Sequence, residues 1–203
     1  MSFAQMKEGT ITYTMDFSSD NPDMAMGISM MQGSKMMLAF MPGASRTEIT
    51  MGTFGTISTV ADEKSGNILM LMDMMGMKNA VKTSQKEMQA ETKKAADNTK
   101  VELTNETKDI SGYKCKKAIV TTEDGQKVDV WYTEQIQAYT QGQQYFNNQI
   151  PGMPMAFSAN ANGMTVNFNV TSIEKTADKS KFTMTIPAGY TEKTYADMKK
   201  MGR

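Results

Sequence analysis

The chain has 203 residues, which is enough for one well-buried domain. Its 39% apolar and 22% charged content is typical of a folded globular protein and excludes a disordered chain. The 22 basic and 22 acidic residues cancel, so net charge gives no attraction toward nucleic acid, and the absence of histidine removes the commonest general base and metal ligand.

The first predicted element is a β-strand over residues 10–17. Ile11, Tyr13 and Met15 alternate there with threonines, so one face of the strand is apolar and the other is rich in hydroxyl groups. Residues 24–30 continue the alternation, with methionine or isoleucine at each even position, and they predict a second strand. Further strands, separated by turn signals, are predicted over residues 35–40, 46–51, 55–61 and 67–73.

The predicted strand at residues 67–73 is apolar on both faces. Ile68, Met70 and Met72 share one face and two leucines lie on the other, so we expect each face to be covered. The longest apolar run, residues 68–77, is interrupted by an aspartate and has about half the ~20 residues that a membrane-spanning helix needs. A spanning helix is therefore not expected at this run.

A later segment predicts a β-hairpin whose register follows from its turn. The pair Asn162-Gly163 suits a two-residue type I′ turn, which requires positive φ at both positions. Such a turn places Phe157 opposite Phe168 on one face of the hairpin. A slip of one residue would scatter that face, so the turn and the alternation agree.

A second hairpin is predicted around Asp124-Gly125. A two-residue turn at this pair places Ile119 opposite Val130. Both faces of this hairpin carry apolar side chains, so we expect each to be at least partly covered.

Helix signals are fewer than strand signals. Ile136, Tyr139 and Phe146 lie on one helical stripe, and residues 195–201 carry a similar apolar stripe at the C-terminus. Residues 84–100 have helix-forming composition without such a stripe, which predicts a solvated helix or a loop.

Together these elements predict a mainly β fold of the α+β class. We expect one curved antiparallel sheet of about 9–11 strands with two or three short helices. No internal repeat or change of composition suggests a linker, so a single domain over residues 1–203 is predicted.

Methionine is the unusual feature of the composition. The chain has 23 methionines, and thirteen of them lie between residues 24 and 77. Thioethers are soft ligands that suit Cu(I), and Met70, Met72 and Met74 would place sulfurs on one side of a strand ~6.6 Å apart. Methionine is also a pliable side chain that fills irregular apolar space. Ordinary core packing, a pliable binding cavity and a Cu(I) site therefore all remain open.

Catalytic motifs are not evident. The sequence has neither a GxSxG elbow nor a GxGxxG loop. Its one cysteine, Cys115, excludes an intrachain disulfide and is expected to be a buried apolar thiol. Without a histidine base or a nucleophile motif, we expect neither an enzyme nor a bound cofactor.

Residues 109–133 resemble an uncharacterised bacterial family, domain of unknown function 4412. Residues 150–155 and 182–192 are also similar to that family and to envelope proteins of the lipoprotein-carrier (LolA-like) type. The residues that carry the resemblance in the first segment are Ile110, Gly112, Tyr113, Cys115, Lys117, Trp131, Tyr132 and Thr133.

This resemblance implies a half-barrel with helices over its concave face. It also implies a cell-envelope protein, periplasmic or lipid-anchored, whose signal peptide is absent from residues 1–203. The better-understood relatives carry lipid or lipoprotein acyl chains in the half-barrel, and no catalytic residue is implied.

The leading hypothesis is therefore a non-enzymatic envelope protein that binds a lipid or acyl chain in the cavity of a curved sheet. A methionine-rich Cu(I) protein, with Met70, Met72 and Met74 as ligands, and a purely structural or partner-binding module are the alternatives. The candidate cavity residues are Met70, Met72, Met74, Trp131, Ile136, Tyr139, Phe146, Phe157 and Phe168.

Overall fold

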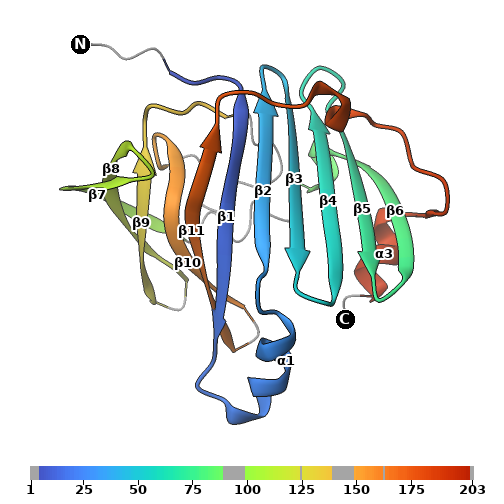
Figure 1. Cartoon of the computed structure of the whole chain (residues 1–203), viewed down its shortest axis with the longest axis horizontal. Coiled ribbons are helices and arrows are strands. Elements are labelled where there is room, and N and C mark those ends of the chain that lie inside the picture. Colours follow the sequence, from blue (N-terminus) through green and yellow to red (C-terminus); the bar gives the residue numbers. More distant parts are fainter. Residues whose placement is uncertain (1–4, 89–98, 124, 139–148, 162, 202–203) are drawn as a thin grey trace.

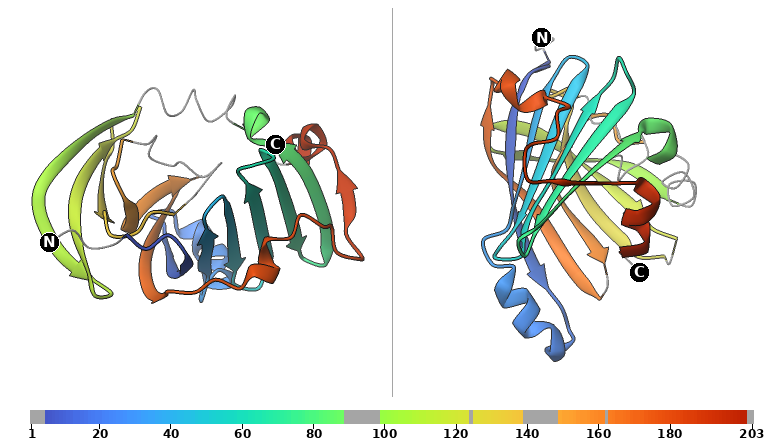
Figure 2. Two further views of the ribbon diagram at one scale, coloured as in Figure 1. Left: turned by 90° about the horizontal axis from the view of Figure 1, so that it is seen from above. Right: turned by 90° about the vertical axis from the view of Figure 1, so that its right-hand side faces the viewer.

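The computed structural model describes residues 5–88, 99–123, 125–138, 149–161 and 163–201. Its dominant feature is one large curved sheet (Figures 1 and 2). The strands of its first half are β1 (Gly9–Ser18), β2 (Lys35–Met41), β3 (Ala44–Met51), β4 (Gly55–Asp62), β5 (Asn67–Met74) and β6 (Met77–Ser84).

The second half of the chain adds further strands and a C-terminal segment. These strands are β7 (Lys100–Ile110), β8 (Tyr113–Thr121), β9 (Lys127–Thr133), β10 (Met153–Ala161), β11 (Met164–Glu174) and β12 (Thr191–Lys193). The short helices are η1 (Pro22–Met24), α1 (Ala25–Met30), η2 (Lys179–Phe182) and α3 (Tyr195–Met201).

The described strands follow the order β12-β6-β5-β4-β3-β2-β1-β11-β10-β9-β8-β7. Neighbouring strands in this part of the chain are antiparallel, except for the parallel pair β12 and β6. The predicted curved antiparallel sheet is therefore confirmed, with twelve described strands in place of the expected 9–11. The single domain over residues 1–203 stays a prediction.

Period-two alternation predicted β1 and the β10–β11 hairpin well. Ile11, Tyr13 and Met15 of β1 are buried and alternate with more exposed residues. Phe157 pairs with Phe168, as the two-residue turn required, and Gly163 has a φ of 76°. Asn162 lies outside the described residues.

The strand predicted at residues 24–30 is wrong, because these residues form η1 and α1. Asn21 caps the turn by accepting a hydrogen bond from the Asp23 backbone N–H at 3.0 Å, and Pro22 follows at the first helical position. This helix-start signal outweighs the alternation, because methionine fits either a helix or a strand. The helix lies at one end of the sheet (Figure 1), and its Met26 is 79% exposed.

The register predicted for the β8–β9 hairpin is also wrong, by one residue. Ile119 pairs with Asp129, and Val130 pairs with Ala118 instead. The turn is longer than two residues, since the Thr122 N–H donates to the Gln126 carbonyl at 2.9 Å. Longer loops with glycine at a positive φ are the next commonest hairpin connection, and they shift the pairing.

The predicted helices have mixed outcomes. The helix at residues 195–201 is confirmed as α3, and Thr194 caps it by accepting a hydrogen bond from the Asp197 N–H at 3.1 Å. In the segment predicted to carry the stripe of Ile136, the described residues 134–138 are not helical. Residues 85–88 are helical, and the rest of the 84–100 prediction up to residue 98 lies outside the described residues.

The main core lies on the concave face of β1, β2 and β8–β11. Tyr13 is 1% exposed, and its hydroxyl donates to the Pro154 carbonyl at 2.8 Å. Phe40 and Ile11 are fully buried beside it, and burying side chains of this size contributes about 1.5–3 kcal/mol each. This half of the concave face is therefore occupied by the protein's own side chains.

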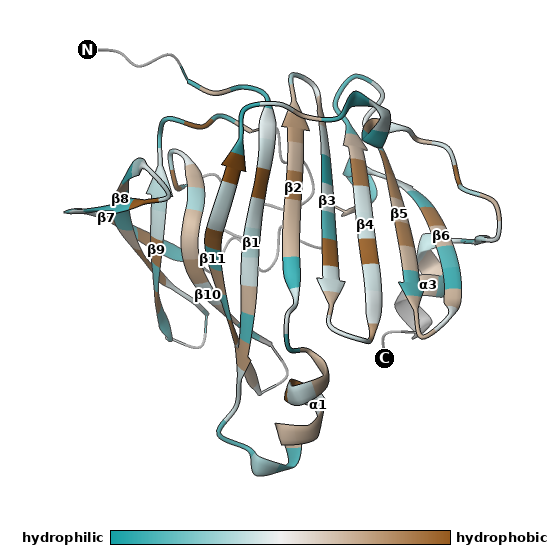
Figure 3. Cartoon of the chain, in the orientation of Figure 1, coloured by the Kyte–Doolittle hydropathy of each residue, from teal (hydrophilic) through white to brown (hydrophobic). Residues whose placement is uncertain are grey.

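The C-terminal segment covers the convex face of the other half of the sheet. It runs outside the curve from β11 toward β6 (Figure 2). Met184, Ile186 and Tyr190 of this segment pack on a buried cluster from β4–β6. Apolar residues run along most of β5, which lies beneath this segment, whereas β3 is largely polar (Figure 3). The buried members of the cluster are Val60, Leu69, Leu71 and Ala80.

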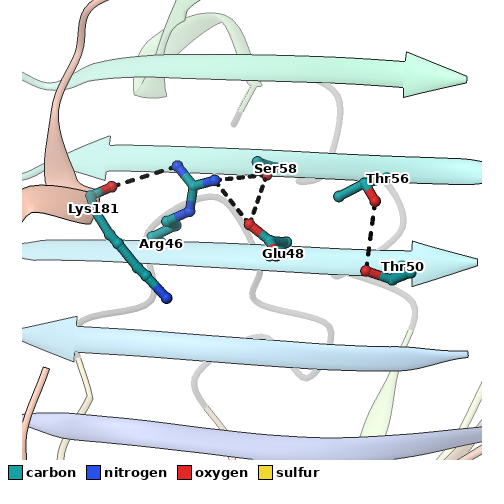
Figure 4. A network of polar contacts seen from close by, with 6 residues as sticks. All are labelled: Arg46, Glu48, Thr50, Thr56, Ser58 and Lys181. Atoms are coloured by element: carbon teal, nitrogen blue, oxygen red, sulfur yellow. Dashed lines mark hydrogen bonds and ion pairs between the residues drawn. The ribbon is translucent and has the colours of Figure 1, made fainter. Parts of the chain in front are cut away.

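A polar network fixes the start of this covering segment on the convex face (Figure 4). Arg46 donates to Glu48 at 2.8 Å and to Ser58 at 2.9 Å, and a weaker bond of 3.4 Å joins it to the Lys181 carbonyl. The Arg46 side chain is 16% exposed, so the Arg46–Glu48 ion pair is better shielded from solvent than most surface pairs. The network attaches η2 to β3 and β4.

Candidate functional site

The candidate site is the concave side of β3–β5, which we call the methionine face and define by Ile49, Ile57, Met70, Met72 and Met74. Its row structure follows from the strand register, in which Ile49 pairs with Ile57 and Ile57 pairs with Met72. All five side chains are half-buried. They therefore form an apolar surface that stays partly accessible.

The orientation of the methionine face follows from the alternation along β5. Leu69 and Leu71 pack against the C-terminal segment on the convex side. Met70 and Met72 therefore point to the concave side, since successive side chains of a strand point to opposite faces. The expectation that both faces of this strand would be apolar is confirmed, and its convex face is covered.

The structure divides the nine predicted cavity residues into separate groups. Met70, Met72 and Met74 lie on the methionine face. Ile136 and Phe157 are buried in the main core, with Trp131 and Phe168 packed against it. Tyr139 and Phe146 lie outside the described residues. The proposed role of these side chains in ligand binding stays a prediction.

Two aromatic residues of the set, Phe157 and Phe168, contact each other in the core. The rings of Phe157 and Phe168 are stacked, with centroids 4.6 Å apart and an interplanar angle of 10°. Tyr13 meets Phe157 edge-on at 6.4 Å, and such pairs add about 0.5–1.5 kcal/mol beyond the area they bury. These contacts indicate that Phe157 and Phe168 serve to pack the core.

Trp131 has a different environment, beside the charged side chains of β7–β9. The Lys108 ammonium lies 4.2 Å from the centre of its ring, within the range of a cation–π contact. Lys117, 6.0 Å from the ring, also forms ion pairs with Asp129 at 2.8 Å and Glu106 at 3.4 Å. Hydrogen bonding to Asp129 raises the pKa of Lys117. These cationic neighbours distinguish Trp131 from the apolar methionine face.

A pocket of about 390 Å³ lies where β5, β6 and the C-terminal segment meet. Its lining is mixed, with a lysine, a carboxylate and hydroxyl groups beside apolar atoms. None of the nine predicted cavity residues lines it. The lining residues are Asn67, Ile68, Lys82, Thr83, Ser84, Glu87 and Met184.

Sequence reasoning missed Ile49 and Ile57 as members of the methionine face. Alternation within one strand shows which side chains share its face, but it does not identify the strands on either side. The turn signal between the strands predicted at residues 55–61 and 67–73 makes β4 the neighbour of β5, and a fixed turn length would have placed Ile57 beside Met72.

Among the described residues, no cluster of three or more His, Cys, Asp or Glu side chains could hold a metal ion. The same part of the chain contains no helix that is long and apolar enough to cross a membrane. Thioether sulfur is outside that set of metal ligands, so the Cu(I) alternative with Met70, Met72 and Met74 stays a prediction.

Cys115 is a buried free thiol, as predicted, and burial raises its pKa from the ordinary value of 9.0 to about 11. Between these values the folded protein keeps a proton that the unfolded chain releases. This thiol therefore leaves the free energy of unfolding unchanged with pH below pH 9. The free energy of unfolding should then fall by at most about 3 kcal/mol as the pH rises to 11. Urea unfolding at several pH values would measure this loss.

The control for the alkaline prediction is Cys115→Ala, which removes the titrating thiol. We expect a weaker dependence of unfolding free energy on pH between 9 and 11 in the variant than in the parent chain. Equal dependence in the two proteins would show that this thiol does not titrate with a raised pKa.

Comparisons with known proteins identify solved structures that are similar to this one. The structure is similar to that of PNGF-II, with a TM-score of 0.54 and 16% identity over 95% of this chain and 32% of that one. The lipoprotein LppX of Mycobacterium tuberculosis is also similar, with a TM-score of 0.40 and 9% identity over 83% of this chain and 88% of that one. A chain of the MucA/MucB complex of Pseudomonas aeruginosa is similar with a TM-score of 0.42 and 10% identity, over 91% of this chain and 62% of that one.

The likeness to PNGF-II supports the curved-sheet fold, and the chain spans about a third of that protein's length. A search of curated proteins finds no match. The resemblance to domain of unknown function 4412 stays a prediction. Residues 66–197 match a family described as N-glycanase peptide, N-terminal domain, and since this match covers more than half of the 203 residues, the chain belongs to that family.

Proposed function

We propose that the chain is a non-catalytic binding domain whose methionine face takes an apolar ligand such as a lipid acyl chain. The observation that carries the proposal is the row of half-buried Ile49, Ile57 and Met72, continued along β5 by Met70 and Met74. Partly exposed apolar side chains on a concave surface can bury an alkyl chain, which contributes about 0.8 kcal/mol for each buried CH₂.

Methionine suits such a surface better than branched side chains do. It is unbranched and polarizable, so it can repack around ligands of different shape. The opposite half of the sheet is filled by Tyr13, Phe40 and Phe157. The proposal therefore places the ligand against β3–β5 and not in the main core.

The N-glycanase activity in the family's description is not part of this proposal. The family is described as an N-terminal domain, and the chain covers 32% of PNGF-II. An accessory role, in which the domain binds a ligand or a partner for a separate catalytic domain, is consistent with the lack of a catalytic motif in this sequence. An envelope location is likewise a proposal, and it is supported by the sequence resemblance.

The fluorescent fatty acid cis-parinaric acid would test the methionine face. The delipidated chain should enhance its fluorescence in a saturable way, and Met70→Gln with Met72→Gln should weaken the binding by roughly tenfold. Glutamine has nearly the length of methionine, but its amide must be desolvated against the alkyl chain, which costs about 0.5–2 kcal/mol per group.

A matched control is Met37→Gln with Met41→Gln, two half-exposed methionines of β2 that lie on its opposite, convex face. These substitutions should leave the fatty-acid affinity unchanged. Absence of saturable binding, or equal loss in the two double variants, would overturn the proposal and leave partner binding as the better account. Urea midpoints would confirm that both variants fold.

A further inference from the structure

A second row of methionines lies across β3–β6, at the end of these strands that carries the β3–β4 and β5–β6 turns. Met51 pairs with Gly55, Gly55 pairs with Met74, and Met74 pairs with Met77. The row lies on the same concave side as Met70, because residues 70 and 74 share one face of β5. Three thioethers from three strands therefore stand in line, with a glycine at the one remaining place.

Gly55 leaves a gap in this row that another residue could not fill. Its φ is 136°, and an added Cβ would lie 2.0 Å from the Asp73 carbonyl oxygen. Met51 and Met74 therefore face each other across β4 with no side chain between them. Two inter-strand steps separate them, or about 10 Å, a span that two extended thioether side chains can close around an ion.

The turn between β5 and β6 brings the third sulfur close. Met75 and Gly76 both have positive φ, 51° and 81°, so this is a two-residue connection that leaves Met74 directly opposite Met77. Side chains opposite each other in a hairpin have Cβ atoms about 4.5–5.5 Å apart. That separation is shorter than the ~6.6 Å between alternate residues along one strand.

Backbone hydrogen bonds hold these strand ends together. The Phe54 carbonyl accepts from the Met75 N–H at 3.0 Å, and the Phe54 N–H donates to the Met51 carbonyl at 2.8 Å. The strand ends that carry the three sulfurs are thereby linked before any ion binds. Met77 is 66% exposed, so an ion can reach the row from solution.

We propose that Met51, Met74 and Met77 form a three-thioether site for a soft monovalent cation, Cu(I) or Ag(I). Thioethers are neutral and soft, so they favour these ions over Mg²⁺, Ca²⁺ or Zn²⁺, which prefer oxygen, nitrogen or thiolate ligands. The site differs from the along-strand set of Met70, Met72 and Met74, with which it shares one residue. It shares Met74 with the methionine face, but fatty-acid binding does not require these three sulfurs to converge.

Competition with a chromogenic Cu(I) chelator under anaerobic, reducing conditions tests the site in the full chain. The parent chain should withdraw one Cu(I), and Met51→Leu or Met77→Leu should each weaken binding by roughly tenfold or more. Even substitutions beyond the direct ligands of a metal cost about 10–100-fold in affinity, so losing a ligand should cost no less. Leucine conserves volume, so the fold should be retained.

Met70→Leu is the matched control, because Met70 lies on the same face of β5 as Met74 but is not one of the three proposed ligands. Its Cu(I) affinity should equal that of the parent chain. No withdrawal of Cu(I) by the parent chain would overturn the proposal. An effect of Met70→Leu as large as that of Met51→Leu would also overturn it, since the ion would then lie along β5.

A second readout uses Ag(I) and the methionine methyl resonances. The methyl signals of Met51, Met74 and Met77 should shift together at one equivalent, while that of the buried Met155 should not move. Binding should be nearly independent of pH from 5 to 7, because a thioether has no proton to lose, in contrast to thiolate or imidazole ligands. A shift confined to one methionine, or a steep loss of affinity at pH 5, would contradict a three-thioether site.

Discussion

Replacing Tyr13 by alanine is expected to lower the free energy of unfolding by about 3–5 kcal/mol, the cost of removing a large aromatic side chain from a packed core. Tyr13 is 1% exposed, meets the edge of Phe157, and donates a hydrogen bond to Pro154. Urea unfolding followed by circular dichroism would measure the change.

Tyr13→Phe separates the hydroxyl from the ring. It should cost about 1–2 kcal/mol, because the Pro154 carbonyl would lose its partner in a buried setting. Tyr113→Phe is the matched control, since the Tyr113 hydroxyl contacts the weak acceptor sulfur of Met6 at 3.7 Å and its loss should cost less. Equal costs for the two phenylalanine variants would show that the Tyr13 hydrogen bond contributes little.

Gly55→Ala should strongly destabilise the pairing of β4 with β5. Its methyl group would lie 2.0 Å from the Asp73 carbonyl oxygen, well inside van der Waals contact, at a φ of 136° that L-residues rarely adopt. The strand pairing must open to relieve the clash. We expect a loss of about 3 kcal/mol or more, measured as a fall in the urea midpoint.

The comparison for this glycine is Gly76→Ala. Gly76 also has a positive φ, 81°, but an added Cβ there meets no atom within 4 Å. Its substitution should therefore cost about 1–2 kcal/mol, the conformational part alone. If Gly55→Ala were no worse than Gly76→Ala, β4 and β5 would not approach each other as closely as the structure has them.

Local patterns predicted the elements whose signals do not conflict. The β1 alternation and the Asn162-Gly163 turn each agree with their surroundings, so the strand and the pairing of Phe157 with Phe168 follow directly. Residues 24–30 carried two signals, an alternation and a helix start at Asn21-Pro22. The start signal prevails because a capped turn satisfies backbone donors, whereas methionine fits a helix or a strand.

The candidate site depends on the register between its strands, which local sequence patterns do not predict. Alternation placed Met70 and Met72 on one face of β5. The neighbour of Met72 across the sheet, Ile57, depends on turn length, and an error of one residue moves every side chain to the other face. The β8–β9 turn shows this sensitivity, since one misjudged turn length changed the partner of Val130.

The order of the strands also bears on how the chain folds. Nine of the eleven neighbouring pairs among the described strands join strands consecutive in sequence, which can form as local hairpins. The pair β1–β11 is different, because it brings Met15 to Phe168 and so closes a loop of most of the chain. Loop-closure entropy opposes that step, so we expect formation of this pair to limit the folding rate. The two sets of hairpins would then form first, and the pairing of β1 with β11 would join them late in folding.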